Sequence, residues 1–262
     1  MEALGGWNAS TITEDVDLGY RAQFGDWKYA YLRDVVSMST LPENISAFRV
    51  QRERWGRGLI HSAFKHLGQM WQQDMPLMKR MHAFSMMFSS VMLASIYALI
   101  LLSLPLNYLL DFDHVVLLWG APLFFLLVAV WALNNAFGAR KGARFDDRPG
   151  VLGTVWHTYL YVAMFPPMAW YYFVGGVRAA FKVYGEFNRT PKGEGEKAAR
   201  QPRINLYLLI GEVFTFLYSA LALYVAIRMG NYLLVPLNAT VCVGFGMVLY
   251  WSFQERRARG RS

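Results

Sequence analysis

The chain has 262 residues, of which 55% are hydrophobic and 17% are charged. Soluble domains carry about a quarter charged residues, so this composition excludes a disordered chain and argues against an ordinary soluble enzyme. The net charge of +8 fits either a nucleic-acid binder or a membrane protein with basic cytoplasmic flanks. Because Cys242 is the single cysteine, an intramolecular disulfide and a zinc site built on cysteines are both excluded.

The first predicted element is a short helix in the polar head that the first 80 residues form. Thr13 is its candidate N-cap, and the helix ends near Gly25. The acids in its first turn are Glu14, Asp15 and Asp17. The helix dipole favours acids at this position, so a structural role for them stands beside a functional one.

The rest of the head predicts a strand and then a longer helix. Residues 27–37 are rich in aromatic residues and valine, which favours a strand. Residues 45–67 alternate apolar and basic side chains at helical spacing, and a basic amphipathic helix ahead of a membrane span commonly lies on anionic lipid. Gln51, Arg54 and Trp55 share one face of it, at i, i+3 and i+4.

Long apolar runs follow the head. Four of them are long enough to cross about 30 Å of hydrocarbon as a helix: residues 84–104, 115–133, 206–227 and 233–253. A fifth run, residues 151–177, contains Pro166-Pro167, and tandem prolines break a helix.

Basic stretches predict how these runs cross the membrane. Residues 140–148, 178–203 and 256–261 are rich in lysine and arginine, as cytoplasmic loops are. If all three are cytoplasmic, the fifth run enters and leaves on one side, as an interfacial or re-entrant helix pair hinged at its prolines. A kinked fifth span is the alternative. We expect four spans, with the N-terminal head and the C-terminus in the cytoplasm.

Short motifs carry a family resemblance. Residues 13–15 (Thr-Glu-Asp), followed by Gln51-x-x-Arg54-Trp55, resemble the TED and QxxRW motifs of membrane-embedded family 2 glycosyltransferases. These are the processive β-glycan synthases related to cellulose synthase, with a glucomannan-synthase-like branch. Residues 5–7 (Gly-Gly-Trp) lie where that family often has this tripeptide, and residues 187–193 (Phe-Asn-Arg-Thr-Pro-Lys-Gly) resemble its gating-loop motif.

The resemblance implies a mainly α fold. We expect a polytopic membrane helix bundle of about four spans plus interfacial helices, with an N-terminal remnant of a GT-A type α/β glycosyltransferase domain. The implied parts are residues 1–80 (the end of the cytoplasmic glycosyltransferase domain with the interfacial helix), 81–136 (a transmembrane hairpin), 137–204 (a cytoplasmic or interfacial segment with the gating-loop-like motif) and 205–262 (a transmembrane hairpin with a basic tail).

The resemblance also implies that the nucleotide-binding half precedes residue 1, so that the chain is N-terminally truncated and inactive alone. The family's divalent metal, Mg or Mn, is bound by a DxD motif of that half. The triplets Asp15-Val-Asp17 and Asp111-Phe-Asp113 are not expected to replace it, so no metal site is expected in this chain.

The implied reaction is inverting transfer of a sugar from a UDP- or GDP-sugar to the end of a growing β-glycan, which the spans export across the cell (inner) membrane. Asp15 is the implied catalytic base, and Glu14 shapes its surroundings. Trp55 would bind the acceptor by stacking, with an interface anchor as the alternative. The residues implied to bind the donor diphosphate are Gln51, Arg54, Thr190 and Lys192.

Two further alternatives stay open. Glu212 is the one charge in its apolar run, and it either faces a glycan tunnel or pairs with a nearby arginine. The chain is either a glycan synthase or a non-catalytic membrane interaction or channel-type subunit that retains half of the motifs. No nucleic-acid partner is expected, because the basic residues lie at membrane-facing ends rather than on one soluble face.

Overall fold

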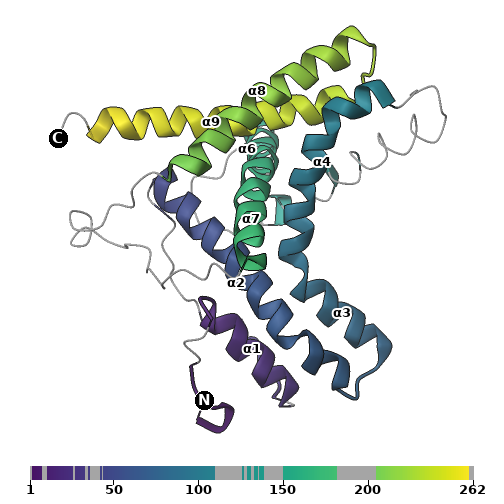
Figure 1. The fold of residues 1–262 in the computed structure, drawn as a ribbon, viewed down its shortest axis with the longest axis vertical. Helices are drawn as coiled ribbons and strands as arrows, with labels where there is room; N and C mark the ends of the chain where they lie inside the picture. The colour runs from purple at the N-terminus through teal and green to yellow at the C-terminus, as the bar shows by residue number, and fades with distance from the viewer. Residues whose placement is uncertain are drawn as a thin grey trace. The chain divides into compact units, whose positions relative to one another are not determined.

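The computed structural model of the protein describes residues 2–7, 11–25, 27–32, 35, 42, 44–109, 126, 129–130, 133–134, 136–138, 150–181 and 205–259. Its helices are η1 (Glu2–Leu4), α1 (Glu14–Phe24), α2 (Ile45–Gln72), α3 (Leu77–Met87), α4 (Ser89–Leu109), α6 (Val151–Ala163), α7 (Phe165–Ala180), α8 (Leu206–Arg228) and α9 (Leu234–Arg259) (Figure 1). The chain forms two compact units. The first unit comprises Met1–Ile96, Ala169–Leu208 and Glu255–Ser262, and the second comprises Tyr97–Met168 and Leu209–Gln254.

The centre of the first unit is α2, which confirms the predicted helix over residues 45–67 and extends it to Gln72. The helix begins at Ile45 because the side chain of Asn44 accepts a hydrogen bond from the Ala47 N–H at 2.8 Å. The carboxylate of Glu255 accepts a second one from the Ser46 N–H at 3.2 Å. These two acceptors satisfy N–H groups that have no partner within the helix.

Helices α1 and α3 pack against the C-terminal half of α2 (Figure 1). The buried residues of this core are Ala63, Met70, Ala83 and Met87. Tyr20 and Phe24 of α1 pack against them and are themselves partly buried. The small side chains at two of the four positions allow the helices to approach closely.

The predicted strand is wrong for the part of it that the structure describes. Residues 27–32 run as exposed, irregular chain, held to α1 by the Trp27 N–H on the Ala22 carbonyl (3.1 Å) and by the Tyr29 hydroxyl on the Gly19 carbonyl (2.7 Å). A strand needs a neighbour to complete its hydrogen bonds, and the described residues contain no strand with which this segment could pair. The expected GT-A α/β remnant is therefore not seen among them.

Three helices in the described ranges are long and apolar enough to cross a membrane: α4, α8 and α9. The predicted spans at 206–227 and 233–253 coincide with α8 and α9, although α9 continues to Arg259. The predicted span at 84–104 is displaced, because the helix breaks at Phe88 and α4 starts at Ser89. The predicted span at 115–133 lies almost wholly outside the described residues.

The fifth apolar run forms two helices, as its prolines predict. Helix α6 ends at Ala163 and α7 begins at Phe165. Pro166 and Pro167 therefore occupy the first turn of α7, where a missing N–H costs no intrahelical hydrogen bond. Whether this pair crosses the membrane stays a prediction.

Polar side chains link the helices of the second unit. Asn238 of α9 accepts a hydrogen bond from Ser103 of α4 at 3.0 Å, and the hydroxyls of Tyr97 and Thr215 lie 2.9 Å apart. Such bonds join helices where lipid offers no polar partner. Glu212 is fully buried, so it does not face lipid, and both of its predicted roles remain open.

Candidate functional site

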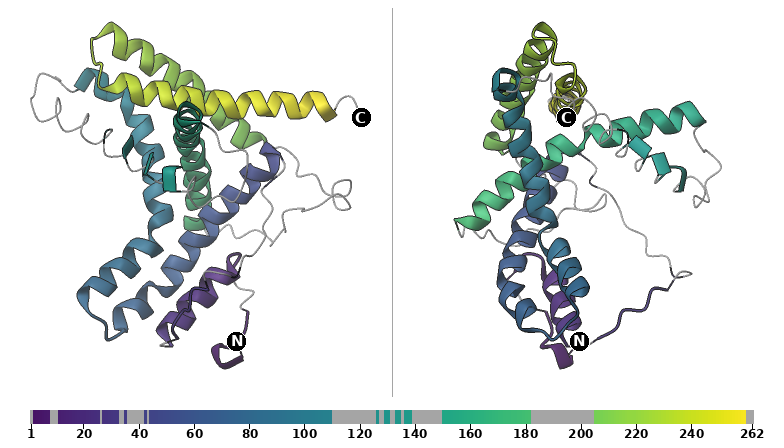
Figure 2. Two further views of the ribbon diagram at one scale, coloured as in Figure 1. Left: turned by 180° about the vertical axis from the view of Figure 1, so that it is seen from behind. Right: turned by 90° about the vertical axis from the view of Figure 1, so that its right-hand side faces the viewer.

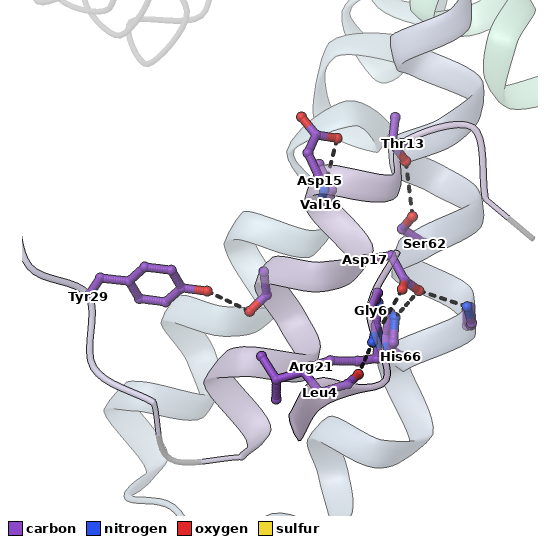
Figure 3. Close-up of polar contacts among 12 residues, drawn as sticks. Leu4, Gly6, Thr13, Asp15, Val16, Asp17, Arg21, Tyr29, Ser62 and His66 are labelled. Carbon is purple, nitrogen blue, oxygen red and sulfur yellow. Dashed lines mark hydrogen bonds and ion pairs between the residues drawn. The ribbon is translucent and has the colours of Figure 1, made fainter. Parts of the chain in front are cut away.

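The Thr-Glu-Asp motif lies at the start of α1, whose bounds confirm the helix predicted between Thr13 and Gly25. The predicted side-chain cap is wrong, because the Thr13 side chain makes no capping hydrogen bond. Its Oγ1 instead lies 3.1 Å from Oγ of Ser62 on α2, and both hydroxyls are buried (Figure 3). The Thr13 side chain therefore contacts α2 rather than capping its own helix.

A glycine on α2 makes room for this contact. A Cβ at Gly58 would lie 2.4 Å from Cγ2 of Thr13, closer than any side chain tolerates. Gly58 lies seven residues after Gln51, four after Arg54 and three after Trp55, so it shares their face of the helix. About one helical turn, roughly 4.5–6 Å along the axis, separates it from Trp55 and Arg54. The structure thus brings the TED turn onto the QxxRW face of α2.

The two acids of the motif differ in exposure. Asp15 is exposed and Glu14 is half-buried. Oδ1 of Asp15 accepts a hydrogen bond from the Val16 N–H at 2.9 Å. The Asp15 carboxylate therefore keeps one oxygen accessible from outside the protein, as a proton acceptor requires.

Asp17, two residues further on, is fully buried and lies within hydrogen-bond distance of basic side chains (Figure 3). Its carboxylate accepts hydrogen bonds from Nε of Arg21 at 2.8 Å and from Nζ of Lys65 at 2.7 Å, and Nε2 of His66 lies 2.8 Å away. Burial alone would raise the pKa of Asp17, but the hydrogen bonds from Lys65, His66 and Arg21, with the charge of Lys65, outweigh it and lower the pKa to about 2.

This role of Asp17 was not predicted from the sequence, where the residue counted as an acid of the first helical turn and as part of the Asp15-Val-Asp17 triplet. The i, i+4 spacing of Asp17 and Arg21 was the available signal for the pair within α1. The two partners from α2, Lys65 and His66, follow only from the packing of the helices.

Arg21 extends the network to the Gly-Gly-Trp segment. Its guanidinium donates to the carbonyls of Leu4 and Gly6, the second at 2.7 Å. Gly5 and Gly6 have φ values of 74° and 66°, in the left-handed region that glycine enters without strain. Residues 4–6 are therefore tied to α1 through the same arginine that binds Asp17.

Around the QxxRW motif, Arg52 holds the tryptophan. The guanidinium of Arg52 lies 4.5 Å from the ring centroid of Trp55 and 5.0 Å from that of Phe48. These cation–π contacts orient a half-buried indole whose remaining surface is available to a ligand. Gln51 and Arg54 are likewise half-buried.

The expectation that α2 lies with its basic face on lipid is wrong for two of its arginines. Arg49 is 1% exposed and Arg57 is 6% exposed, so neither reaches a headgroup. Burial lowers the pKa of Arg57, and the nearby Glu53 partly opposes that shift. These side chains serve packing within the first unit.

The residues that the structure describes do not fit a divalent metal. Among them, no three histidine, cysteine, aspartate or glutamate side chains come together. Within the Asp15-Val-Asp17 triplet, Asp17 is already bound to cations. No step of the chemistry is assigned to a metal in this chain, and Asp111 and Asp113, like Thr190 and Lys192, lie outside the described ranges.

Comparisons with known proteins agree with the motifs. The family model of glycosyl transferase family group 2 matches residues 1–137. A probable glucomannan 4-beta-mannosyltransferase 1 of Arabidopsis thaliana is 43% identical over 58 residues, which are 22% of this chain and 10% of that protein. The glucomannan 4-beta-mannosyltransferase 1 of Oryza sativa subsp. japonica is 45% identical over 58 residues, 22% of this chain and 11% of that protein. The similarity thus spans about a tenth of each relative's length. No solved structure matches the chain.

Proposed function

The chain belongs to glycosyl transferase family group 2, and we propose that it transfers a sugar from a nucleotide-sugar donor to the end of a β-linked glycan with inversion at the anomeric carbon. The resemblance stated from its motifs is confirmed at the level of the family. The observation that carries the proposal is the close packing of Thr13 on Gly58, because it joins the TED turn to the QxxRW face of one helix.

In this proposal Asp15 is the general base. It takes the proton of the acceptor hydroxyl while that oxygen attacks the anomeric carbon and the nucleoside diphosphate leaves from the opposite side. A single displacement needs one base, and the exposed carboxylate of Asp15 supports this assignment. Glu14, half-buried beside it, shapes the approach to the base.

The QxxRW face is proposed to bind both reactants. The planar guanidinium of Arg54 matches two oxygens of a diphosphate, and Gln51 adds a hydrogen bond. The indole of Trp55, held by Arg52 at 4.5 Å, offers a flat surface for the last sugar of the acceptor. Thr190 and Lys192 remain proposed diphosphate ligands on the strength of their motif alone.

We further propose that the protein is a multi-pass protein of the cell (inner) membrane that exports its glycan. The helices α4, α8 and α9 are apolar enough to span a bilayer. The last turn of α9 carries Arg256, Arg257 and Arg259, which supports a cytoplasmic C-terminus. UDP- and GDP-sugars are the proposed donors, and the relatives named above, which are glucomannan mannosyltransferases, support a mannose donor as the first to test.

The test is sugar transfer by the native protein, purified from its own membranes and reconstituted in vesicles, with a panel of UDP- and GDP-sugars. We expect one donor to give a β-linked polymer. Asp15→Asn should lower the rate by about 10²–10⁴-fold, because that is what loss of a general base costs. The affinity for the nucleoside diphosphate should change by less than a few-fold.

Asp74→Asn is the matched control, since Asp74 is an exposed acid beyond the end of α2. It should keep the wild-type rate. Absence of transfer from every donor would overturn the proposal in favour of a non-catalytic membrane subunit. Wild-type turnover in Asp15→Asn would leave Asp15 as a helix-start acid only.

A further inference from the structure

Helices α2 and α7 cross within the first unit with their backbones in contact (Figure 2). A Cβ at Gly56 of α2 would lie 2.8 Å from Cα of Tyr172, and a Cβ at Gly175 of α7 would lie 2.6 Å from the carbonyl oxygen of Glu53. Both distances are below what a side chain tolerates. The crossing therefore depends on a glycine in each helix, and its register is fixed within a fraction of a turn.

The buried carboxylate of Glu53 stabilises the crossing of α2 and α7. The Glu53 side chain is 5% exposed, and its Oε1 accepts a hydrogen bond from Nη1 of Arg178 on α7 at 3.0 Å. Nη2 of Arg57 lies 3.7 Å from its other oxygen. The same Nη1 of Arg178 also donates to the hydroxyl of Tyr207 at 2.9 Å. Arg178 lies in the last turn of α7, where a cation is favoured by the helix dipole.

The Glu53–Arg178 pair forms a clasp between α2 and α7. This clasp and the candidate site occupy opposite faces of α2. Glu53, Gly56 and Arg57 follow each other at i, i+3 and i+4, and they form the face toward α7. At 100° per residue, the face that carries Gln51, Arg54, Trp55 and Gly58 is turned by about 160° from it. Because both faces belong to one helix, contacts that fix the rotation of the first face about the helix axis also fix the rotation of the second.

We propose that Glu53, paired with Arg178, is a positioning residue: it sets the rotation of α2 so that the QxxRW face meets the TED turn. This inference rests on the proposed function. Glu53 reaches neither donor nor acceptor and acts through the helix. Because Glu53 directly precedes Arg54, a rotation of α2 that follows loss of the pair moves the guanidinium of Arg54 away from the leaving diphosphate.

The first measurement is kinetic, on the native protein in vesicles, with rates taken per nucleotide-binding site so that unfolded protein does not count. Glu53→Gln keeps the shape of the side chain and removes its charge. We expect kcat to fall about tenfold or more, since a misplacement of about 1 Å costs up to 10²-fold. The KM for the donor should change less than threefold. Arg178→Lys, which keeps the cation, should retain most of the rate, and Asp74→Asn should retain all of it.

The second measurement does not depend on activity. Spin labels at Gln23 of α1 and Ala180 of α7, both exposed, are placed on a Cys242→Ala background. The wild-type background should give one narrow distance distribution, and Glu53→Gln should shift or broaden it, while Arg178→Lys should not. This readout holds even if no donor is found.

The outcomes separate the two proposals. If no sugar is transferred but the distances respond to Glu53→Gln, the proposed function fails and the clasp stands as a structural lock. If sugar is transferred and Glu53→Gln changes neither kcat nor the distances, the positioning role is overturned. If the distances respond and kcat per binding site does not, the pair is structural only and the positioning role is likewise overturned.

Discussion

At the scale of single residues, the acids of α1 differ in their environment and therefore in what they can do. Asp15 is exposed and Asp17 is fully buried, although only Val16 separates them. An exposed carboxylate can exchange protons with a ligand, while a buried one held by Arg21, Lys65 and His66 cannot. The Asp-Val-Asp triplet therefore joins the proposed base to a structural anchor.

The anchor makes a pH prediction. The pKa of Asp17 falls from 3.8 to about 2 on folding, so its ionised form stabilises the fold. This contribution, about 2 kcal/mol, is fully present above pH 3.8 and is lost as the pH falls toward 2. The measurement is the free energy of unfolding of the reconstituted protein at several pH values, compared with Asp17→Asn.

The comparison with Asp17→Asn isolates this residue from the other titrating groups. Wild type should exceed the variant by a constant amount above about pH 4, and the difference should shrink between pH 4 and 2. A difference that stays constant down to pH 2 would show that the Asp17 carboxylate gains nothing from Lys65, His66 and Arg21.

At the scale of the helices, close packing through glycine decides what the site can be. Gly58 admits Thr13 on one face of α2, and Gly56 meets α7 on the other. Because α2 is held on both faces, these glycine contacts help to set its rotation, together with the Glu53–Arg178 pair. Glycine costs helix stability, so its presence at these positions requires a packing reason.

The glycine positions can be tested against one another on the same helix. Gly58→Ala brings a methyl group to 2.4 Å from Cγ2 of Thr13, a β-branched side chain that cannot turn away freely. We expect a loss of about 1–3 kcal/mol in the free energy of unfolding, together with loss of sugar transfer. Chemical denaturation and the transfer assay measure the two effects.

Gly68→Ala is the control, because a Cβ there meets nothing within 4 Å. It should leave transfer unchanged and stabilise the protein by up to about 1 kcal/mol, which is the helix preference of alanine over glycine. Equal effects of the two variants would contradict the close contact between Thr13 and α2.

Local sequence patterns predicted some helices correctly, but they failed for other segments of the chain. The ends of α1 follow from Thr13 and Gly25, and α8 follows from its apolar length, because both depend on residues near in sequence. The extended chain at 27–32 has the composition of a strand, but strand formation depends on a neighbour that composition does not specify. The break at Phe88 was missed because the apolar run continues across it.

The candidate site was predicted in its motifs but not in its contacts. The TED and QxxRW motifs follow from the order of residues along the chain. Their contact at Gly58 joins parts of the chain that are far apart in the sequence. Thr13 and Ser62, whose side chains meet there, are 49 residues apart, and no local pattern predicts such a contact. Likewise, the burial of Glu53 depends on Arg178 of α7, a partner 125 residues away.

At the scale of the whole molecule, the basic flanks predict the orientation of the spans. Cytoplasmic segments of membrane proteins carry the excess of lysine and arginine. The last turn of α9 ends in three arginines, whereas the turn between α8 and α9 has Arg228 alone at its start. The flanks therefore predict a cytoplasmic end of α9 and an α8–α9 turn on the outer side.

Single cysteines test this orientation, and the chain suits the method because Cys242 is its one native cysteine. On a Cys242→Ala background, Tyr232→Cys places a thiol in the α8–α9 turn, where Tyr232 is 73% exposed. Ala258→Cys places one at the exposed end of α9, and Gln23→Cys places one on α1. Each is treated with a membrane-impermeant thiol reagent before and after the cells are opened.

We expect Tyr232→Cys to react in intact cells, and Gln23→Cys and Ala258→Cys only after opening. The basic flanks are one reason for this expectation. The number of spans is the other, because an even number of crossings between α1 and the end of α9 returns the chain to the same side of the membrane. Four spans satisfy this, with α6 and α7 entering and leaving on one face. If Gln23→Cys and Ala258→Cys react from opposite sides, the number of crossings is odd, and residues 151–177 become a kinked fifth span despite the basic residues on both of its flanks.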